Sequence, residues 1–345
     1  MKVLAWTTGA RHRGDGQFHY RIDTPLTEAQ YQGLCTWEYT GLVEGAKLAD
    51  VNVVIQHLGA THEMIQVFDL LQQLPILMVV EHDDDMLNLR EDNPVFRTGQ
   101  KDWAYYQSTW RDSILESLQK ADLITVSVPH LAEVYAEHTS TPIVVLPNTI
   151  DEVLLTLDPP VREPGQPLRV GWGGSRSHDL DWRGAADAVR YALNKTGAHL
   201  TIMGADYRSA IGYKNTEYLA WTNNIAEYYA VVNSFHVMLA PLSNDLWNRS
   251  KSPLKALEAA ALGVPTIASA VRPYEDFIVH GETGFLCRTE TDWMKALREL
   301  DNDEDLRREM GRKARERAAE FTTQLWAPRW IQAYVDGLKR KLGLP

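Results

Sequence analysis

Short apolar segments alternate with longer helical stretches along the whole chain, and this alternation limits the possible folds more than any other feature. Segments 51–56 and 76–81, for example, consist mainly of Val, Ile, Leu and Met. They lack the regular polar alternation of a strand that has one face in solvent. Apolar strands separated by helices are typical of parallel sheets that helices cover on both faces. The sequence therefore predicts an α/β fold.

The predicted elements form two successive series. Strands of the first series are expected at 3–6, 51–56, 76–81, 123–128 and 143–146, and those of the second at 168–172, 199–203, 235–240, 266–268 and 284–287. Helical patterns lie near 61–73, 103–120, 130–138, 181–195, 223–234, 252–262 and 303–319. Because the series starts twice, two similar domains are expected.

A proline-rich segment separates the two series. The sequence Asp-Pro-Pro-Val-Arg-Glu-Pro-Gly-Gln-Pro, which begins at residue 158, has the composition of a linker. We therefore expect two Rossmann-like domains, 1–160 and 161–322, whose parallel sheets face a central cleft. A final helix within 323–345 carries aromatic residues at every fourth position, which gives it one apolar face, and it is expected to pack across the domain junction.

Charge is unevenly distributed over the chain, whose net charge is −11. Residues 1–165 hold 11 Lys and Arg against 24 Asp and Glu, whereas the remainder holds 24 against 22. The second half is therefore the better place for an anionic ligand. No apolar stretch approaches the roughly 18–20 residues that span a bilayer, so we expect a soluble, cytoplasmic protein. Two cysteines, Cys35 and Cys287, are too few for a disulfide framework and are expected as buried thiols.

The predicted helix near 252–262 is the most informative segment. Lys251 would lie at its N-terminus, where partial positive charge favours an anion, and either serine flanking Lys251 can cap it. Lys255 and Glu258 are three residues apart and would share one face. A cation beside a carboxylate suits a nucleotide, because the cation neutralises a diphosphate and the carboxylate accepts hydrogen bonds from ribose hydroxyls. The same pattern also fits an ordinary surface ion pair.

A glycine-rich turn follows the first strand of the second domain, in the sequence Val-Gly-Trp-Gly-Gly-Ser. Gly173 and Gly174 would let the backbone approach a ligand closely, and the hydroxyl of Ser175 can donate to a phosphate oxygen. The spacing is neither that of a dinucleotide fingerprint nor that of a Walker motif. These residues therefore indicate a phosphate-binding turn or a plain strand-to-helix connection.

Acidic residues follow the predicted strand 76–81 in the sequence Glu-His-Asp-Asp-Asp. His82 or Asp83 can contact an acceptor hydroxyl and assist its deprotonation. Asp83 and Asp85 also have the D-x-D spacing of a divalent metal site, which is the least favoured interpretation, and we expect no metal. A solvated strand end explains the cluster equally well.

The loop after the first strand is the one basic island in the acidic first domain. It carries Arg11, Arg13 and Arg21 together with two histidines. Guanidinium groups bind phosphates and carboxylates through paired hydrogen bonds. The loop is expected to close over a phosphate or to receive an anionic acceptor, although a solvated mobile loop has the same composition.

Taken in chain order, these segments resemble the GT-B glycosyltransferases, and within them the broad family 4-like group. Lys251, Lys255 and Glu258, followed by Ala-Leu-Gly-Val-Pro-Thr-Ile-Ala-Ser, look like the nucleotide-binding helix and following strand of that family. Three further family motifs are matched by Gly281-Glu-Thr-Gly-Phe-Leu, Leu146-Pro-Asn-Thr-Ile-Asp and Ile124-Thr-Val-Ser. The resemblance touches both halves and is most specific over 235–290.

The resemblance implies transfer of a sugar from a UDP- or GDP-sugar, held by 161–322, to an acceptor hydroxyl, held by 1–160. Family members usually need no metal and retain anomeric configuration, so side chains and N–H groups stabilise the departing diphosphate. The implied donor-binding residues are Gly173, Gly174 and Ser175 for phosphate, Lys251 and Lys255 for diphosphate, and Glu258 for ribose. The residues expected on the acceptor side are His82, Asp83 and Asp85, with Arg11, Arg13 and Arg21 at the entrance. His82, Asp83, Lys251 and Lys255 are the expected catalytic residues.

The sequence departs from the family pattern in two places. Ser250 stands where the first Glu of a paired-glutamate motif is expected, eight residues before Glu258, and in the family that Glu touches the transferred sugar. The family's Arg and Lys after the first strand of the second domain are also missing, which leaves more of the phosphate binding to Lys251 and Lys255.

Three alternatives stay open. Sugar-nucleotide epimerases share the architecture, and the missing glutamate also fits a non-catalytic nucleotide-sugar-binding protein. The Gly-Trp-Gly-Gly-Ser and Asp-Asp-Asp forms resemble a bacterial and phage subgroup, some phage members of which glycosylate hydroxymethylated DNA bases. The arginine island and the basic tail Lys339-Arg-Lys favour a DNA acceptor, whereas the acidic first domain argues against one.

Overall fold

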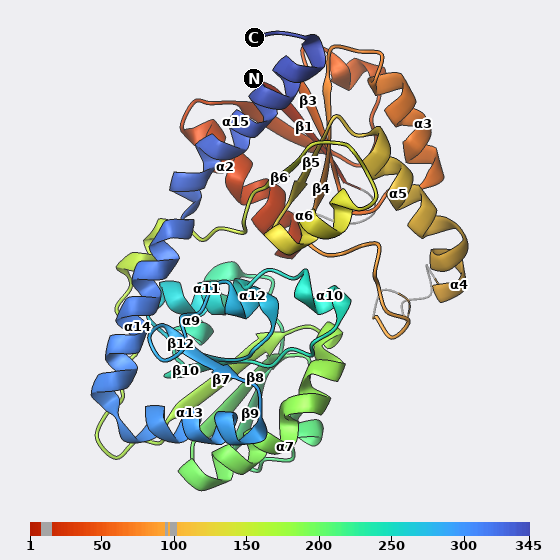
Figure 1. The fold of residues 1–345 in the computed structure, drawn as a ribbon. Coiled ribbons are helices and arrows are strands. Elements are labelled where there is room, and N and C mark those ends of the chain that lie inside the picture. The colour runs from red at the N-terminus through yellow and green to blue at the C-terminus, as the bar shows by residue number, and fades with distance from the viewer. Residues whose placement is uncertain (8–15, 94–95, 97–101) are drawn as a thin grey trace. The chain divides into compact units, whose positions relative to one another are not determined.

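The computed structural model describes residues 1–7, 16–93, 96 and 102–345, which form two compact units (Figure 1). The first unit comprises Met1–Thr149, Ser250–Ser252 and Thr323–Pro345, and the second comprises Ile150–Arg249 and Pro253–Thr322. The chain thus leaves the first unit after Thr149, returns to it briefly at Ser250–Ser252, and returns again for the final helix.

The first unit is built from alternating strands and helices. In chain order they are β1 (Lys2–Thr7), α1 (Gly16–Phe18), the π-helix η1 (His19–Asp23), α2 (Thr24–Tyr31), β2 (Thr36–Thr40), the 3-10 helix η2 (Gly45–Leu48), β3 (Val53–His57), α3 (His62–Leu71), β4 (Leu77–His82), α4 (Trp103–Tyr105), the π-helix η4 (Tyr106–Trp110), α5 (Arg111–Lys120), β5 (Leu123–Val126), α6 (Pro129–Ala136), β6 (Ile143–Val145) and, last in the chain, α15 (Thr323–Leu342).

The six strands of this unit form one parallel sheet in the order β2-β1-β3-β4-β5-β6. Helices α2 and α15 lie side by side on one face, and α3 and α5 pack together on the other (Figure 1). From α15, Trp330 and Tyr334 are fully buried, and a Cβ on Gly337 would lie 3.1 Å from the Leu77 side chain. The final helix is therefore an integral part of the core of the first unit.

The second unit repeats the same architecture. Its elements are the 3-10 helix η5 (Glu152–Thr156), β7 (Arg169–Gly174), the 3-10 helix η6 (Arg176–His178), α7 (Asp179–Thr196), β8 (His199–Gly204), α8 (Arg208–Ile211), β9 (Thr216–Leu219), α9 (Ile225–Val232), β10 (Val237–Ala240), α10 (Leu246–Arg249), α11 (Leu254–Ala261), β11 (Thr266–Ser269), α12 (Arg272–Glu275), β12 (Gly284–Cys287), α13 (Glu290–Asn302), α14 (Glu304–Ala318) and the 3-10 helix η7 (Ala319–Phe321).

The second sheet is also parallel and has the order β12-β11-β10-β7-β8-β9. A core around Trp172 and Trp182 fills the space between the sheet and helices α7 and α13. A second core, which includes Phe235 and Leu257, lies on the other face beneath α9, α11 and α14. Both faces of the sheet are thus covered, and two Rossmann-like units are confirmed.

Two strands and several helices were not expected from the sequence. The missed strands, β2 and β9, each occupy one edge of a sheet. Their sequences, Thr-Trp-Glu-Tyr-Thr and Thr-Glu-Tyr-Leu, are polar, and most of their residues are exposed or half-buried. A search for continuous apolar runs therefore overlooks them. Among the described helices, none has both the length and the apolar composition needed to cross a bilayer. Cys35 and Cys287 are buried thiols, as expected.

Candidate functional site

The strand order of the second sheet singles out one place for a ligand. The chain runs from β7 through β8 to β9 at one edge and then returns to β10 on the other side of β7. In open parallel sheets, ligands bind beyond the carboxyl ends of the strands at such a reversal. The loops after β7 and β10 therefore frame the candidate site, and helix α11 supplies further residues to it.

The glycines of β7 make room for bulky side chains of the same unit. A Cβ on Gly171 would lie 2.1 Å from the Phe235 ring, and one on Gly174 would lie 2.8 Å from the Trp172 ring. A Cβ on Gly173 would come within 3.2 Å of the Met203 side chain. Packing alone thus explains why three glycines stand here. That Gly173 and Gly174 also bring backbone close to a phosphate stays a prediction.

Ser175 follows β7 and is exposed at the start of the loop. Its hydroxyl oxygen caps η6 by accepting a hydrogen bond from the Ser177 N–H, at 3.4 Å. The Tyr207 hydroxyl lies 3.2 Å from the carbonyl oxygen of Ser175 and 2.8 Å from the Asp179 carboxylate. These contacts fix the backbone that leads from the strand into α7.

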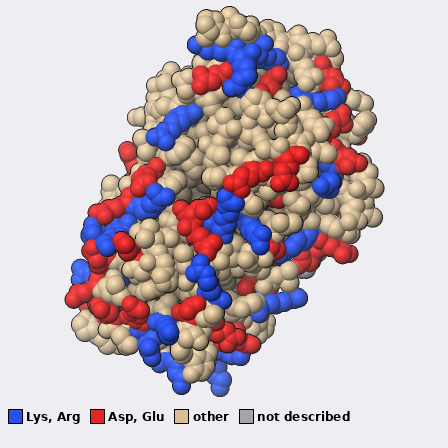
Figure 2. Space-filling model, in the orientation of Figure 1, with Lys and Arg blue, Asp and Glu red and all other residues tan. Residues whose placement is uncertain are grey.

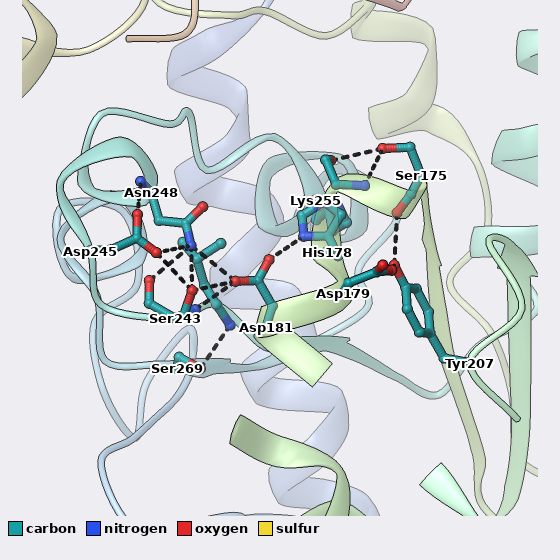
Figure 3. Close-up of polar contacts among 12 residues, drawn as sticks. Ser175, His178, Asp179, Asp181, Tyr207, Ser243, Asp245, Asn248, Lys255 and Ser269 are labelled. Atoms are coloured by element: carbon teal, nitrogen blue, oxygen red, sulfur yellow. Dashed lines mark hydrogen bonds and ion pairs between the residues drawn. The ribbon is translucent and has the colours of Figure 1, made fainter. Parts of the chain in front are cut away.

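Lys255 of α11 contacts His178, which lies in the segment after β7 (Figure 3). Its ammonium nitrogen lies 3.0 Å from Nε2 of His178, and it lies 5.9 Å from the ring centroid of Trp172. The other ring nitrogen of His178, Nδ1, lies 2.6 Å from Oδ2 of Asp181. Lys255, His178 and Asp181 therefore form a continuous polar chain, which runs from the half-buried ammonium group to a carboxylate that is 2% exposed.

The buried carboxylate of Asp181 is held from the loop that follows β10. Its Oδ1 accepts hydrogen bonds from the backbone N–H and the hydroxyl of Ser243, both at 2.8 Å, and from the Asn248 side chain at 2.9 Å. Asp245 binds the same two residues, with its carboxylate 2.9 Å from the Ser243 hydroxyl and 3.1 Å from the Asn248 amide (Figure 3). Both loops at the reversal point are thereby linked through one carboxylate.

Glu258, one turn after Lys255 on α11, is also buried and paired. Its Oε2 accepts a hydrogen bond from the Tyr228 hydroxyl at 2.6 Å. Burial raises the pKa of Tyr228 well above its usual value, and the Glu258 charge raises that pKa further. The Tyr228 ring lies 5.9 Å, centroid to centroid, from Trp221, whose side chain is 53% exposed. The carboxylate is therefore fixed, and an exposed indole lies beside its partner.

Lys251 belongs to Ser250–Ser252, the short piece grouped with the first unit. Helix α11 begins at Leu254 with Pro253 at its N-cap position, and proline has no side-chain acceptor, so the expected serine cap is wrong. Ser252 accepts a hydrogen bond from Asn148, at 2.9 Å. The hydroxyl of Ser250 is fully buried, and no described residue bonds to it.

Arg21 does not lie at an exposed entrance, which corrects the expectation for this residue. Helix η1 turns its side chain into the core of the first unit, where its Nε lies 2.6 Å from Glu81 and neither side chain is exposed. Burial raises the pKa of Glu81, and the Arg21 charge opposes this rise. The pairing compensates a buried charge. Arg11 and Arg13 lie outside the described residues.

His82 ends β4 and is fully buried. Its Nδ1 lies 2.8 Å from the Tyr135 hydroxyl, and its Nε2 accepts a hydrogen bond from the Gly59 N–H at 3.4 Å. Burial lowers the pKa of His82 to about 3, so the ring is uncharged at neutral pH. Its predicted contact with an acceptor therefore requires a neutral imidazole.

Asp83, Asp84 and Asp85, the clustered acids after β4, all accept hydrogen bonds. The Gln17 amide donates to Asp83 at 3.1 Å and to Asp84 at 2.8 Å. Asp85 is buried and accepts hydrogen bonds from the N–H groups of Leu87 and Asn88, both at 3.1 Å, while burial raises its pKa. Within the described part of the chain, no three His, Cys, Asp or Glu residues are grouped closely enough to hold a metal ion. The acceptor role of Asp83 and Asp85 stays a prediction.

Residues 179–303 match the sequence profile of the family described as "Glycosyl transferases group 1". This range contains α7, the loop after β10 and α11, and hence Asp181, Lys255 and Glu258. Over 97% of its length the chain also superimposes on sucrose-phosphate synthase from Thermosynechococcus elongatus, with a TM-score of 0.66, 16% identity and coverage of 99% of that chain. The chain therefore has the GT-B fold, and its residues 179–303 carry the sequence pattern of group 1 glycosyltransferases.

Two further solved structures share the GT-B fold. Anabaena HepE in complex with UDP has a TM-score of 0.68 and 12% identity, with 97% of this chain and 100% of that chain covered. The pneumococcal O-GlcNAc transferase GtfA in complex with UDP and GlcNAc has a TM-score of 0.59 and 18% identity, with 85% and 58% covered. At these identities the likeness establishes the fold.

Curated group 1 relatives match over shorter segments. The D-inositol 3-phosphate glycosyltransferase of Stackebrandtia nassauensis is 37% identical over 94 residues, which are 27% of this chain and 21% of that protein. The N-acetyl-alpha-D-glucosaminyl L-malate synthase of Bacillus anthracis is 33% identical over 125 residues, or 35% and 31%. The matched segments thus span between a fifth and a third of the relatives' lengths.

The sequence interpretation missed His178 and Asp181. Both lie just after the glycine-rich turn, in the sequence Ser-His-Asp-Leu-Asp that ends at residue 181. Their spacing of three at a helix start was the available signal, because it places the two side chains on one face. What the sequence did not show was that Lys255, 77 positions from His178, meets the same imidazole.

Proposed function

We propose that the chain transfers a sugar from a nucleoside diphosphate donor to an acceptor hydroxyl, and that the second unit holds the donor. The observation that carries the proposal is the arrangement on α11, where Lys255 and Glu258 are each fixed by a partner from the same unit, at 3.0 Å and 2.6 Å. Both residues lie in the range that matches group 1 glycosyltransferases, at the reversal point of the sheet.

The roles follow from the chemistry of the two side chains. The Lys255 ammonium group would stabilise the negative charge that develops on the departing diphosphate, and preorganised charges of this kind supply a large part of enzymatic rate enhancement. The Glu258 carboxylate would accept hydrogen bonds from ribose hydroxyls. With a lysine in this role, we propose that the reaction needs no divalent metal. Retention of anomeric configuration is proposed from the family resemblance.

We propose uridine as the base of the donor. HepE and GtfA, which share the fold, have both been seen with UDP. The exposed Trp221 ring next to Tyr228 offers an apolar platform on which a base can stack. A pyrimidine placed there would lie near the carboxylate proposed to hold its ribose.

We propose that the acceptor binds the first unit. Two of the cations that favoured a DNA acceptor are paired with carboxylates. Arg21 is buried against Glu81, and Lys341 of the basic tail is paired with Asp122 at 2.7 Å. On the face drawn in Figure 2, acidic and basic side chains are interspersed. A hydroxyl on a glycan or a small molecule is therefore the acceptor that we propose.

A thermal-shift screen tests the donor site. UDP, GDP and ADP, each with and without magnesium, are added to the wild-type protein and to Lys255→Ala. At a concentration 100 times its dissociation constant, a ligand stabilises the folded state by about 2.7 kcal/mol. We expect UDP alone to raise the melting temperature by several degrees, with or without magnesium, and the rise to be much smaller in Lys255→Ala.

Lys195→Ala is the matched control, because Lys195 is an exposed lysine near the end of α7. It should respond to UDP as the wild type does. A wild-type protein that no nucleotide stabilises would contradict the proposed donor site. Assays with UDP-sugars then separate the rivals: an isomeric sugar formed without acceptor indicates an epimerase, and tight binding with no turnover indicates a binding protein.

A further inference from the structure

The Lys255 ammonium group is held by an imidazole. Its nitrogen lies 3.0 Å from Nε2 of His178, and the carboxylate of Asp181 lies behind that ring, 2.6 Å from Nδ1 (Figure 3). A direct contact with Asp181 would be an ion pair that neutralises the lysine. The interposed ring separates the two charges while keeping them connected through hydrogen bonds.

The hydrogen-bond partners assign the tautomer of His178. Oδ1 of Asp181 accepts three hydrogen bonds, two from Ser243 and one from Asn248, and this stabilises the ionised carboxylate. An ionised carboxylate only accepts hydrogen bonds, so Nδ1 of His178 must carry the proton. In the neutral ring Nε2 then has a lone pair, which accepts from the Lys255 ammonium group. The chain therefore has one consistent direction, from Lys255 to His178 to Asp181.

We propose that His178 and Asp181 are positioning residues, which orient the Lys255 ammonium group towards the diphosphate of the donor. This rests on the proposed function, because it assigns a task to the donor site. A lysine side chain has four rotatable bonds and loses considerable conformational freedom when it is fixed. The contact with the imidazole, at 3.0 Å, fixes the direction of the ammonium group.

The anchoring of Asp181 supports this assignment. The carboxylate is 2% exposed and is tied to the loop after β10, so the far end of the chain cannot shift without breaking three hydrogen bonds. The imidazole is held in a second way, because its ring meets the fully buried Trp172 ring edge to face, with 5.7 Å between centroids. The position of the lysine thus derives from rigid parts of the second unit.

Asp181→Asn is the decisive variant, because it changes the tautomer and keeps the shape. The amide oxygen can still accept from Ser243 and Asn248, while the amide NH2 now faces Nδ1 of His178. The ring must then carry its proton on Nε2, and this N–H points at the ammonium group and repels it. At metal sites, loss of a partner that orients a ligand side chain typically lowers affinity or activity about 10–100-fold. We expect a loss in this range both for UDP affinity and for release of UDP from a UDP-sugar.

Three further variants separate positioning from a merely structural role. In His178→Gln, the neutral amide oxygen can accept from Lys255, and UDP affinity should stay within about threefold of wild type. Asp187→Asn removes an exposed carboxylate from the same helix and should leave binding unchanged. Combined with Lys255→Ala, Asp181→Asn should weaken UDP binding no further, since residues that act through one group are not additive. Additive losses, or wild-type UDP affinity in folded Asp181→Asn, would overturn the proposal.

Nitrogen-15 NMR of the histidine rings gives a test that does not depend on turnover. We expect the neutral, Nδ1-protonated tautomer for His178 in the wild type and the Nε2-protonated one in Asp181→Asn. An Nε2-protonated ring in the wild type would overturn the proposal even where UDP binds. Conversely, a wild type that binds no UDP but shows the expected tautomer would overturn the proposed function and leave the hydrogen-bonded chain as assigned.

Discussion

At the scale of single residues, the contact between Tyr228 and Glu258 joins stability to binding. The tyrosine ring is 7% exposed and the carboxylate is 3% exposed, and the two groups lie 2.6 Å apart. A buried carboxylate needs donors, because water cannot solvate it. The same bond fixes the direction in which Glu258 would meet a ribose.

Tyr228→Phe should therefore lower both the stability and the ligand affinity of the protein. Removing one partner of a buried hydrogen bond costs about 1–3 kcal/mol, and more where the remaining group is charged. Urea unfolding gives the change in free energy, and calorimetry gives the change in UDP affinity, which should fall. Tyr191→Phe, on the exposed face of α7, is the control and should alter neither quantity appreciably. Unchanged UDP affinity in Tyr228→Phe would argue against the role of Glu258.

At the scale of elements, one of the three glycines of strand β7 and the single glycine of helix α7 have opposite effects on stability. Gly171 lies in β7, where a Cβ would overlap the Phe235 ring at 2.1 Å. Gly184 lies in α7, where a Cβ would meet nothing within 4 Å. The strand needs its glycine for packing, whereas the helix has no such need.

Replacing glycine by alanine at the two sites should thus change the free energy of unfolding in opposite directions. Gly184→Ala should stabilise the protein by about 0.5–1 kcal/mol, because alanine loses less backbone freedom in a helix. Gly171→Ala should destabilise it by at least about 1–3 kcal/mol through overpacking. Equilibrium unfolding measures both. In a Phe235→Ala background the loss caused by Gly171→Ala should shrink, and an equal loss in both backgrounds would show that Phe235 is not the cause.

Elements with continuous apolar patterns were predictable, and the polar edge strands β2 and β9 were not. The central strands β3 and β4 were found because both faces of a parallel sheet are covered. The edge strand β9 has exposed positions and an acidic residue, so pairing with β8 rather than composition makes it a strand. Within the candidate site, the pairing of Lys255 and Glu258 on one helical face could be predicted from their spacing in the sequence. His178 could not be linked to Lys255, because their contact depends on how β7 and α11 are placed in space.

At the scale of the whole molecule, each unit contains a histidine that resists protonation. Burial lowers the pKa of His82, in the first unit, to about 3, and burial together with the Arg169 charge lowers that of His236, in the second, to about 4. In the unfolded chain a histidine titrates near 6.5. Between these values the unfolded state binds more protons than the folded state, so stability falls as the pH falls below about 6.5.

Each of these histidines should contribute a slope of about 1.4 kcal/mol per pH unit between its folded pKa and about 6.5. In the wild-type protein the backbone N–H of Arg169 donates to Nδ1 of His236 at 2.9 Å. His236→Asn keeps an acceptor for this N–H but has no side chain that titrates. Unfolding of this variant between pH 7 and pH 5 should show a smaller loss of stability with acid. His62→Asn, at an exposed position, is the control and should follow the wild type. An unchanged slope in His236→Asn would exclude His236 as a source of acid sensitivity.

The two units should also differ in their ability to fold alone. The residues at which the chain enters and leaves the second unit are adjacent, since Ile150 and Thr322 form a bridge. A fragment of residues 150–322 should therefore melt cooperatively. A fragment of residues 1–149 lacks Trp330 and Tyr334, which are fully buried in the core of the first unit. This fragment should not melt cooperatively. Circular dichroism melts of both fragments check this, and a cooperative melt of 1–149 would contradict it.

The place of α15 also sets an order of events on the ribosome. The sheet of the first unit is synthesised before the second unit, whereas α15, one of the helices that cover that sheet, is synthesised after it. As synthesis proceeds from N- to C-terminus, that sheet keeps an apolar face exposed while the whole second unit is being translated. The second unit, by contrast, has all its elements once Thr322 has emerged. Of the two units, the one that is begun earlier is thus completed later, and during that interval it is the part that depends on protection from aggregation.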